Sequence, residues 1–345
     1  MLHRKQYRVA AGVTIMALAL TLTACGTQEN TGSTESLKST ETVENTETVK
    51  GTETVESTET IENAEIIEAM VSESAAPQGT ANVTPQMQPV EYTDVQQITL
   101  DSTWEYADHS KINTGAAVLY RAPEESGPKG IVIGVNAGHG TAGGSSVRTL
   151  CHPDGSPKST GGSTAAGATT ATAVSGGMTF YDGTPESEVT FRMAQILRDR
   201  LLSQGYDVLM VRDDADVQLD NVARTVICNN VADCHISLHW DGDGLSYDKG
   251  CFYIAVPDAI KDMEPVATHW QQHNALGASL VNWLGDVGMK IHGSGSMAID
   301  LTQTSYSTIP SVDMELGNAS SDHSDETLEN IADGLMAGIN AYYGY

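Results

Sequence analysis

Apolar and polar positions follow two different periods along the last two thirds of the chain. A short continuous apolar run at 131–135 is typical of a strand covered on both faces. Segments with apolar residues every three or four positions predict amphipathic helices. The strands are expected at 131–135, 207–212, 234–240, 250–257 and 311–318, and the helices at 187–206, 219–232, 268–288 and 325–343. This alternation predicts a single α/β domain with a mostly parallel, twisted sheet and helices on both faces.

The first part of the chain predicts a lipoprotein signal peptide at 1–24. A basic segment at 3–8 precedes an apolar stretch that ends at Cys25, and this stretch is too short for a transmembrane helix. The ending LTAC resembles the lipobox of bacterial lipoproteins, in which the cysteine becomes the lipidated N-terminus. The resemblance implies an extracytoplasmic protein, anchored by lipid on Cys25 to the outer face of the cytoplasmic membrane. An ordinary cleaved signal peptide is the alternative.

Residues 25–97 predict a disordered linker that starts at the lipidated Cys25. The segment repeats a unit of the form ETV-x-x-T, and residues 26–97 hold 14 acidic against 2 basic side chains. One apolar residue per unit cannot build a buried face, so a solvated tether that repels itself is expected. Residues 98–127 are then the N-terminal flank of a catalytic domain at 128–345.

Charge and cysteine content narrow the possible functions. The formal net charge is −27 at pH 7, and residues 98–345 hold 31 acidic against 13 basic side chains. Because nucleic-acid binding calls for a basic face, we expect no nucleic-acid partner. The four later cysteines do not have the CxxC spacing of a thiolate zinc site, and either two disulfides or free thiols remain open. These cysteines are Cys151, Cys228, Cys234 and Cys251. The oligomeric state also stays open.

Four polar residues stand near the expected carboxyl ends of strands, where active groups gather in parallel sheets. His139 follows the first strand between two glycines, and His239 follows the third. Glu186 opens a helix, and Glu315 lies in the last strand. Two imidazoles and a carboxylate suit catalytic zinc (Zn²⁺), because three protein ligands leave a fourth position for water. A further carboxylate can take the proton of that water and pass it to a leaving amine.

Four motifs follow one another along the chain: AGHG, ESEV, ISLHWD and PSVDMELGN. Their order resembles that in the zinc-dependent N-acetylmuramoyl-L-alanine amidases of amidase type 3, the autolysin and spore-cortex type. The resemblance covers roughly residues 128–345. It implies that His139, Glu186 and His239 bind zinc and that Glu315 is the general base and acid. The implied partner is peptidoglycan, cut between N-acetylmuramic acid and the L-alanine of the stem peptide. A zinc peptidase acting within the stem peptide and a non-catalytic wall-binding lipoprotein are the alternatives.

The chain departs from the family pattern before and after these motifs. Asn136-Ala137 replaces the usual Asp-Pro, and because asparagine still accepts a hydrogen bond, we expect tuning of the site rather than its loss. Trp240-Asp241 replaces a small residue and an amide. The long insertion at 141–184 is expected to be either a lid or groove wall, or a flexible segment without a role.

Several other residues compete for these roles. Glu188, two positions after Glu186, is the competing metal ligand. His269 and His273 have the spacing of a metalloprotease helix, but they lack the adjacent glutamate, so a surface or packing pair is expected. Arg224 is expected to be structural.

Overall fold

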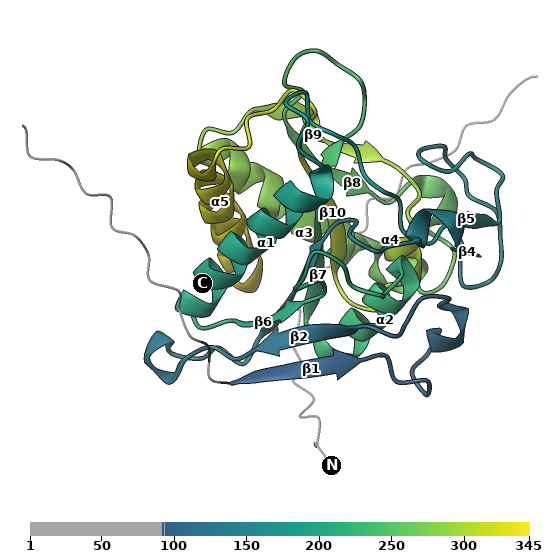
Figure 1. Ribbon diagram of the computed structural model, residues 1–345, viewed down its shortest axis with the longest axis horizontal. Coiled ribbons are helices and arrows are strands. Elements are labelled where there is room, and N and C mark those ends of the chain that lie inside the picture. The colour runs from purple at the N-terminus through teal and green to yellow at the C-terminus, as the bar shows by residue number, and fades with distance from the viewer. Residues whose placement is uncertain (1–91, 93) are drawn as a thin grey trace, which may run out of the picture. The chain divides into compact units, whose positions relative to one another are not determined.

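An eight-stranded sheet organises the chain in the computed structural model, which describes residue 92 and residues 94–345 (Figure 1). Its strand order is β1 (Val95–Thr99), β2 (Ala116–Tyr120), β6 (Asp207–Met210), β3 (Val132–Ala137), β7 (Cys234–Asp241), β10 (Ser311–Asn318), β8 (Cys251–Ala255) and β9 (Ile291–Ala298). The central strands β6, β3, β7 and β10 run parallel. At the sides, the pairs β1–β2, β2–β6 and β10–β8 are antiparallel, and β9 runs parallel to β8. The predicted mostly parallel α/β sheet is confirmed.

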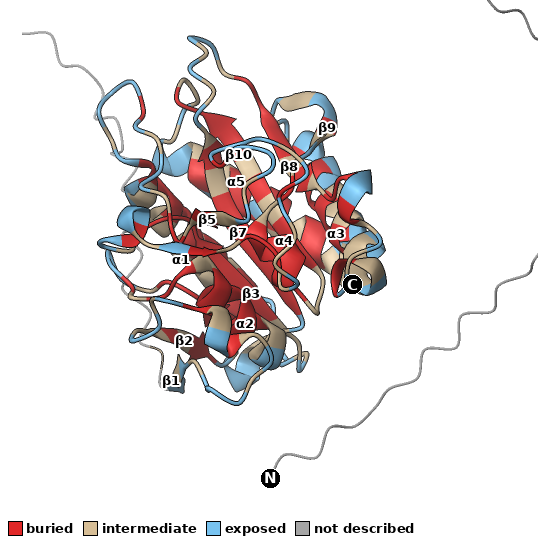
Figure 2. Ribbon diagram, turned by 90° about the vertical axis from the view of Figure 1, so that its right-hand side faces the viewer, coloured by how far each residue is buried: buried red, intermediate tan, exposed pale blue. Residues whose placement is uncertain are grey.

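Helices cover both faces of this sheet, as the alternating pattern predicted. On one face lie α1 (Glu186–Ser203), α3 (Val266–Asp286) and α5 (Asp325–Tyr343), whose core residues include Leu197, Leu280 and Leu335. The other face carries α2 (Asn221–Val231) and the short α4 (Thr302–Tyr306). Figure 2 shows the buried residues concentrated in the central strands and on the helix sides that face them. Every predicted strand and long helix is present within three residues of its expected bounds.

The core is built from alternate side chains of each central strand. In β3, Ile133, Val135 and Ala137 point into the core beneath α1, and Gly134 and Asn136 therefore face the opposite side. Burying apolar side chains on one face stabilises the fold by about 25 cal/mol for each Å² removed from water. The same alternation leaves a polar row on the face that carries α2 and α4.

The two outermost strands were not predicted. β1 begins at Val95, inside the span 25–97 expected to be a linker, and it pairs with β2 from the predicted flank 98–127. At the opposite edge, β9 pairs with β8. Neither segment has a continuous apolar run, because an edge strand gains its backbone pairing from a neighbour and leaves much of its side-chain surface in solvent. The boundary at residue 97 is therefore placed too late.

The insertion has elements of its own. Two short strands, β4 (Arg148–Leu150) and β5 (Thr170–Thr172), pair antiparallel. Short 3₁₀ turns occur in the described chain at Ala107–His109, Glu124–Ser126, Gly144–Ser146 and Asp258–Ile260.

No helix among the described residues is both long and apolar enough to cross a bilayer. Cys25, the signal peptide and residues 25–91 lie outside the described residues, so the lipid anchor stays a prediction.

Candidate metal centre

The first candidate ligand, His139, follows β3 in a left-handed backbone conformation. Its φ is 64°, a region that few non-glycine residues adopt, although histidine is enriched there. The ring nitrogen Nδ1 lies 2.9 Å from the carbonyl oxygen of Ser175. Because a carbonyl only accepts hydrogen bonds, Nδ1 carries a proton, and in the neutral ring Nε2 therefore has the lone pair that a metal needs. The turn after β3 therefore aims an imidazole nitrogen suited to a metal at the edge of the sheet.

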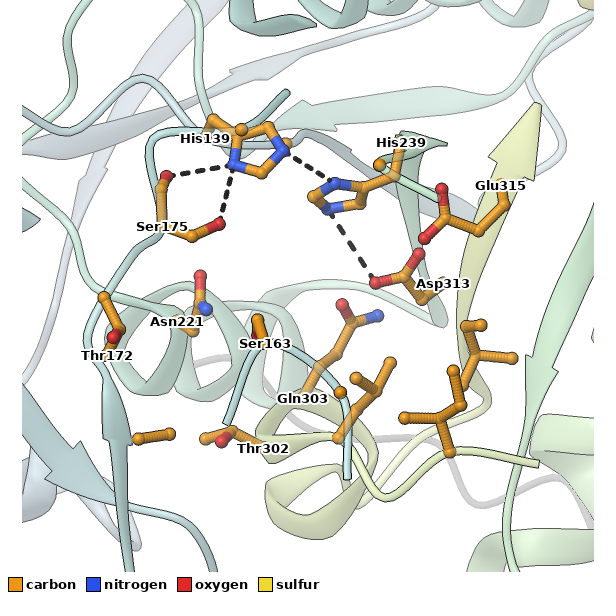
Figure 3. Close-up of a pocket in the computed structure, with 18 of the residues that line it drawn as sticks. His139, Ser163, Thr172, Ser175, Asn221, His239, Thr302, Gln303, Asp313 and Glu315 are labelled. Atoms are coloured by element: carbon orange, nitrogen blue, oxygen red, sulfur yellow. Dashed lines mark hydrogen bonds and ion pairs between the residues drawn. The ribbon is translucent and has the colours of Figure 1, made fainter. Parts of the chain in front are cut away.

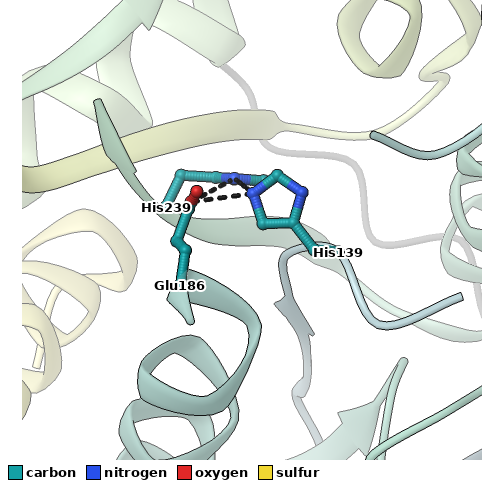
Figure 4. A group of neighbouring side chains, drawn as sticks. All are labelled: His139, Glu186 and His239. Carbon is teal, nitrogen blue, oxygen red and sulfur yellow. Dashed lines mark hydrogen bonds and ion pairs between the residues drawn. The ribbon is translucent and has the colours of Figure 1, made fainter. Parts of the chain in front are cut away.

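Glu186 is the first residue of α1, and its carboxylate is enclosed by the other two candidates (Figure 4). Its Oε1 lies 2.8 Å from His139 Nε2 and 3.2 Å from His239 Nδ1. Backbone N–H groups of Met178 and Trp240 donate to the same carboxylate. Glu188 is exposed and lies outside this group. The structure thus brings Glu186, and not Glu188, together with the two histidines.

Glycine is required at two positions because other side chains of the site approach the backbone. A Cβ on Gly138 would lie 2.3 Å from His239 Cε1. A Cβ on Gly177, in the insertion, would lie 2.8 Å from His139 Cδ2 and 3.0 Å from Glu186 Oε2. Contacts under 3 Å cannot form, so a methyl group at either position displaces a candidate ligand. This is the reason for the bare backbone around the first histidine.

The distances within the cluster fit a tetrahedral cation. His139 Nε2 and His239 Nδ1 are 3.1 Å apart, and all three ligand atoms lie within 4.8 Å of one another. Zinc–nitrogen bonds of about 2.0–2.1 Å give a tetrahedral edge of roughly 3.3–3.4 Å. Two ring nitrogens that face each other and a carboxylate at this spacing therefore match a zinc site. Within the described part of the chain, no other set of three or more His, Cys, Asp or Glu side chains meets this criterion.

Charge in the cluster also favours a cation. Burial alone would raise the pKa of the Glu186 carboxyl, but the facing rings of His139 and His239 hold this pKa well below its usual range. Burial alone would lower the pKa of His239, but Asp313 and Glu186 raise it to about 10. The lowered pKa keeps Glu186 as a carboxylate, which is the form that binds a cation.

Glu315 and Asp313 form a pair of carboxyl groups beside His239 (Figure 3). In the parallel ladder Glu315 pairs with His239, and Asp313, two residues earlier in β10, projects from the same face. Glu315 Oε2 and Asp313 Oδ1 are buried without a hydrogen-bond partner. Burial raises the pKa of both carboxyl groups, and Asp313 raises that of Glu315 further. The sequence analysis missed Asp313, although the period of two in β10 places it beside Glu315.

Arg224 stabilises the turn that carries His139. Its guanidinium is buried and donates to the carbonyl oxygen of His139 at 2.7 Å and to Oδ1 of Asn136 at 3.0 Å. Asn136 also donates to the hydroxyl of Ser237 at 2.8 Å. Burial lowers the pKa of Arg224 to about 9. Asn136 thus accepts a hydrogen bond, as expected, from the same guanidinium that donates to the backbone of His139.

A cavity of about 640 Å³ opens in front of the cluster, and the insertion forms much of its wall. Ser163, Thr172 and Ser175 line it from the insertion, and Asn221 and Gln303 line it from the α2 and α4 side (Figure 3). A volume in this range suits a ligand of drug size.

The insertion is docked onto the domain by Asp300, which lies just after β9. The fully buried Asp300 carboxylate faces His152 Nε2 at 2.8 Å and accepts from the backbone N–H of Ser159 at 2.7 Å. The Nζ of Lys158 donates to the Asp300 carbonyl oxygen. Of the two possibilities for residues 141–184, this structure supports the ordered groove wall.

The remaining candidates lie outside the site. His273 is buried in α3 and accepts from the backbone N–H of Ser311 at 2.9 Å, while His269 is half-buried. The pair therefore has a packing role, as expected. All four described cysteines are free and buried, and burial raises the pKa of each thiol. The open question about disulfides is thereby answered in favour of free thiols.

Comparison with known proteins identifies the family of this chain. A family model described as N-acetylmuramoyl-L-alanine amidase matches residues 133–340. Because the match spans more than half of the 345 residues, the chain belongs to this family. The membership supports the peptidoglycan amidase function predicted from the four motifs.

Solved structures show the same fold. The N-acetylmuramyl-L-alanine amidase Ami1 of Mycobacterium smegmatis is 19% identical over 62% of this chain and 97% of its own, with a TM-score of 0.52. The apo form of Ami1 from Mycobacterium abscessus is 22% identical over 62% of this chain and 99% of its own, also with a TM-score of 0.52. Among curated protein sequences, none matches the chain.

Proposed function

We propose that the chain hydrolyses the amide bond between N-acetylmuramic acid and L-alanine in peptidoglycan, using zinc held by His139, Glu186 and His239. The observation that carries the zinc assignment is the clustering of these three side chains at the carboxyl edge of the sheet. Two imidazoles and one carboxylate would leave one of four coordination positions on zinc for water, and all three side chains line the cavity. Zinc at this site supplies a water of lowered pKa and polarises the scissile carbonyl.

Glu315 is the proposed general base and acid. Its Oε2 is buried without a partner at the cavity wall, on the strand next to His239. From this position the carboxylate accepts the proton of the attacking water and returns it to the departing L-alanine nitrogen. Proton transfer of this kind contributes about 10²- to 10⁴-fold to the rate.

The cavity wall binds the substrate on both sides of the scissile bond. Hydroxyl and amide side chains of Ser163, Thr172, Asn221 and Gln303 offer donors and acceptors to sugar hydroxyls and peptide groups. The insertion that contributes the first two is held by buried Asp300, so these contacts are set before substrate arrives.

Mass spectrometry of purified cell wall digested by the native protein tests the assignment. The expected product is a stem peptide with a new amino terminus at L-alanine. The Glu315→Gln variant should lose at least about 100-fold in rate while binding zinc as tightly as the native protein. Glu188→Gln is the matched control, because Glu188 is an exposed glutamate in the same helix turn as Glu186; its rate should stay native.

Other outcomes would contradict the proposal. New amino termini inside the stem peptide would assign a zinc peptidase instead. Binding to the wall without cleavage, by protein that holds no zinc, would assign a wall-binding lipoprotein. Full activity of Glu315→Gln would show that the proton is carried by another group.

We also propose that the protein acts outside the cytoplasmic membrane, tethered by lipid on Cys25 through the acidic segment 25–94. This location is supported by the proposed substrate, because the cell wall lies outside the cytoplasmic membrane. Metabolic labelling with a radioactive fatty acid tests it: the native chain should take up label and Cys25→Ala should not. Unlabelled native chain would contradict the anchor.

A further inference from the structure

The second ring nitrogen of His239 faces a carboxylate that has no role in the proposed reaction. Nδ1 of His239 points to His139 and Glu186, and Nε2 lies 3.8 Å from Oδ2 of Asp313 (Figure 3). The two residues project from the same face of neighbouring parallel strands, because Ser237 pairs with Asp313 and β7 alternates. Only 13% of the Asp313 side chain is exposed.

The other histidine has the corresponding arrangement with a different partner. Nε2 of His139 faces the cluster, and its Nδ1 donates to the carbonyl oxygen of Ser175. An imidazole that binds a metal through one nitrogen carries a proton on the other, and a carbonyl or carboxylate that faces this N–H fixes the tautomer and the ring. His139 donates to such a partner, the carbonyl oxygen of Ser175, at 2.9 Å, and the carboxylate that faces Nε2 of His239 is that of Asp313, at an ion-pair distance of 3.8 Å.

We propose that Asp313 is a positioning residue: its carboxylate faces the protonated Nε2 of His239, keeps Nδ1 turned to the cluster and strengthens zinc binding. The inference rests on the proposed function, because it concerns the same metal site. A carboxylate at an ion-pair distance acts on the ring in this enclosed site more strongly than it would in water.

A purely structural role for Asp313 does not explain its surroundings. Oδ1 is buried without a hydrogen-bond partner, and an unpaired buried oxygen costs folding free energy. Replacing Asp313 by an apolar side chain of similar size removes this cost together with the 3.8 Å contact to His239, so the metal-free stability is expected to change little. The proposal therefore predicts different results for two measurements: zinc affinity falls, while metal-free stability stays close to native.

The test measures both quantities on the full-length protein. Zinc affinity is determined by competition with a chromophoric chelator, and stability by urea unfolding in excess chelator. The variants are Asp313→Asn, which keeps an acceptor without the charge, and Asp313→Leu, which removes both. Asp258→Asn is the control, because Asp258 is an exposed aspartate paired with Lys261.

Asp313→Asn should weaken zinc binding by about 10- to 100-fold, and Asp313→Leu at least as much. Neither should lower the urea midpoint of the metal-free protein, and Asp258→Asn should leave the affinity native. Native zinc affinity in both Asp313 variants would overturn the proposal. An affinity loss that follows an equal loss of metal-free stability would also overturn it, since the effect would then come from the fold.

The experiments can refute the role of Asp313 and the proposed amidase function independently of each other. A native protein that binds zinc but leaves the wall intact would refute the amidase assignment. The ratio of the zinc affinities of the native protein and its Asp313 variants would still decide the role of Asp313. A native protein that digests the wall, with Asp313 variants of native zinc affinity, would refute only the role of Asp313.

Discussion

Asp300 joins the insertion to the domain, and removing its carboxylate tests whether the insertion is a fixed wall. In Asp300→Ala, His152 Nε2 and the backbone N–H of Ser159 lose an acceptor in a site where Asp300 and His152 are both 0% exposed. Removing one partner of a buried pair costs about 3–5 kcal/mol. At 1.4 kcal/mol per factor of ten, this corresponds to roughly a hundred- to several-thousand-fold change in the opening equilibrium of the insertion.

Amide hydrogen exchange measures this opening directly. The reporters are the N–H groups of Cys151 and Lys158, which donate to the carbonyl oxygens of Thr169 and Ala168 inside the insertion. Their protection should fall by about 100-fold or more in Asp300→Ala. The exposed Asp154 of the same insertion is the control, because Asp154→Ala is expected to change stability by only about 0.5 kcal/mol. Less than about a tenfold loss of protection in Asp300→Ala would refute the reasoning.

Three further predictions concern the same domain. Gly138→Ala should weaken zinc binding by at least about 100-fold, because the methyl group would overlap the His239 ring. Competition with a chelator measures the affinity. The control Gly161→Ala should bind zinc as the native protein does, because a Cβ on Gly161 meets nothing closer than 4.0 Å. The four buried cysteines should react with a thiol reagent only after the protein is unfolded, and no reductant should be needed. Fewer than four reactive thiols would reveal a disulfide. Burial alone would raise the pKa of Asp300, but the hydrogen bonds from His152 and Ser159 and the nearby charges lower it. Its contribution to stability is therefore complete above the unfolded value of 3.8 and is lost as pH falls through the lower folded pKa. Urea unfolding below about pH 4 should show a steeper loss for the native chain than for Asp300→Asn, and equal slopes would contradict this.

The central elements and the order of the candidate ligands could be predicted because their physical cause is local. A strand buried on both faces, such as residues 132–137, needs a continuous apolar run, and an amphipathic helix such as α1 needs a stripe of apolar residues. In parallel strands the carboxyl ends meet at one edge, so His139 and His239 were expected to lie near each other. The structure places them there, and their role as zinc ligands remains the proposal.

Other features could not be predicted because they depend on contacts between distant residues. The pattern of 141–184 did not distinguish a wall from a flexible segment, since the deciding contact joins His152 to Asp300, 148 positions later. Glu186 and Glu188 are both acids in the first turn of one helix, and only the packing of α1 against the sheet buries the first and exposes the second.

By itself, the sequence determined which segments form the central sheet and its helices, and which motifs lie at one edge of that sheet. Tertiary structure alone decided the edge strands β1 and β9, the state of the cysteines and the position of Asp313 behind His239. Periodicity records which side of an element is buried, but not which residue of a neighbouring strand lies opposite. That neighbour is set by strand order and register, and both are fixed only when the whole sheet assembles.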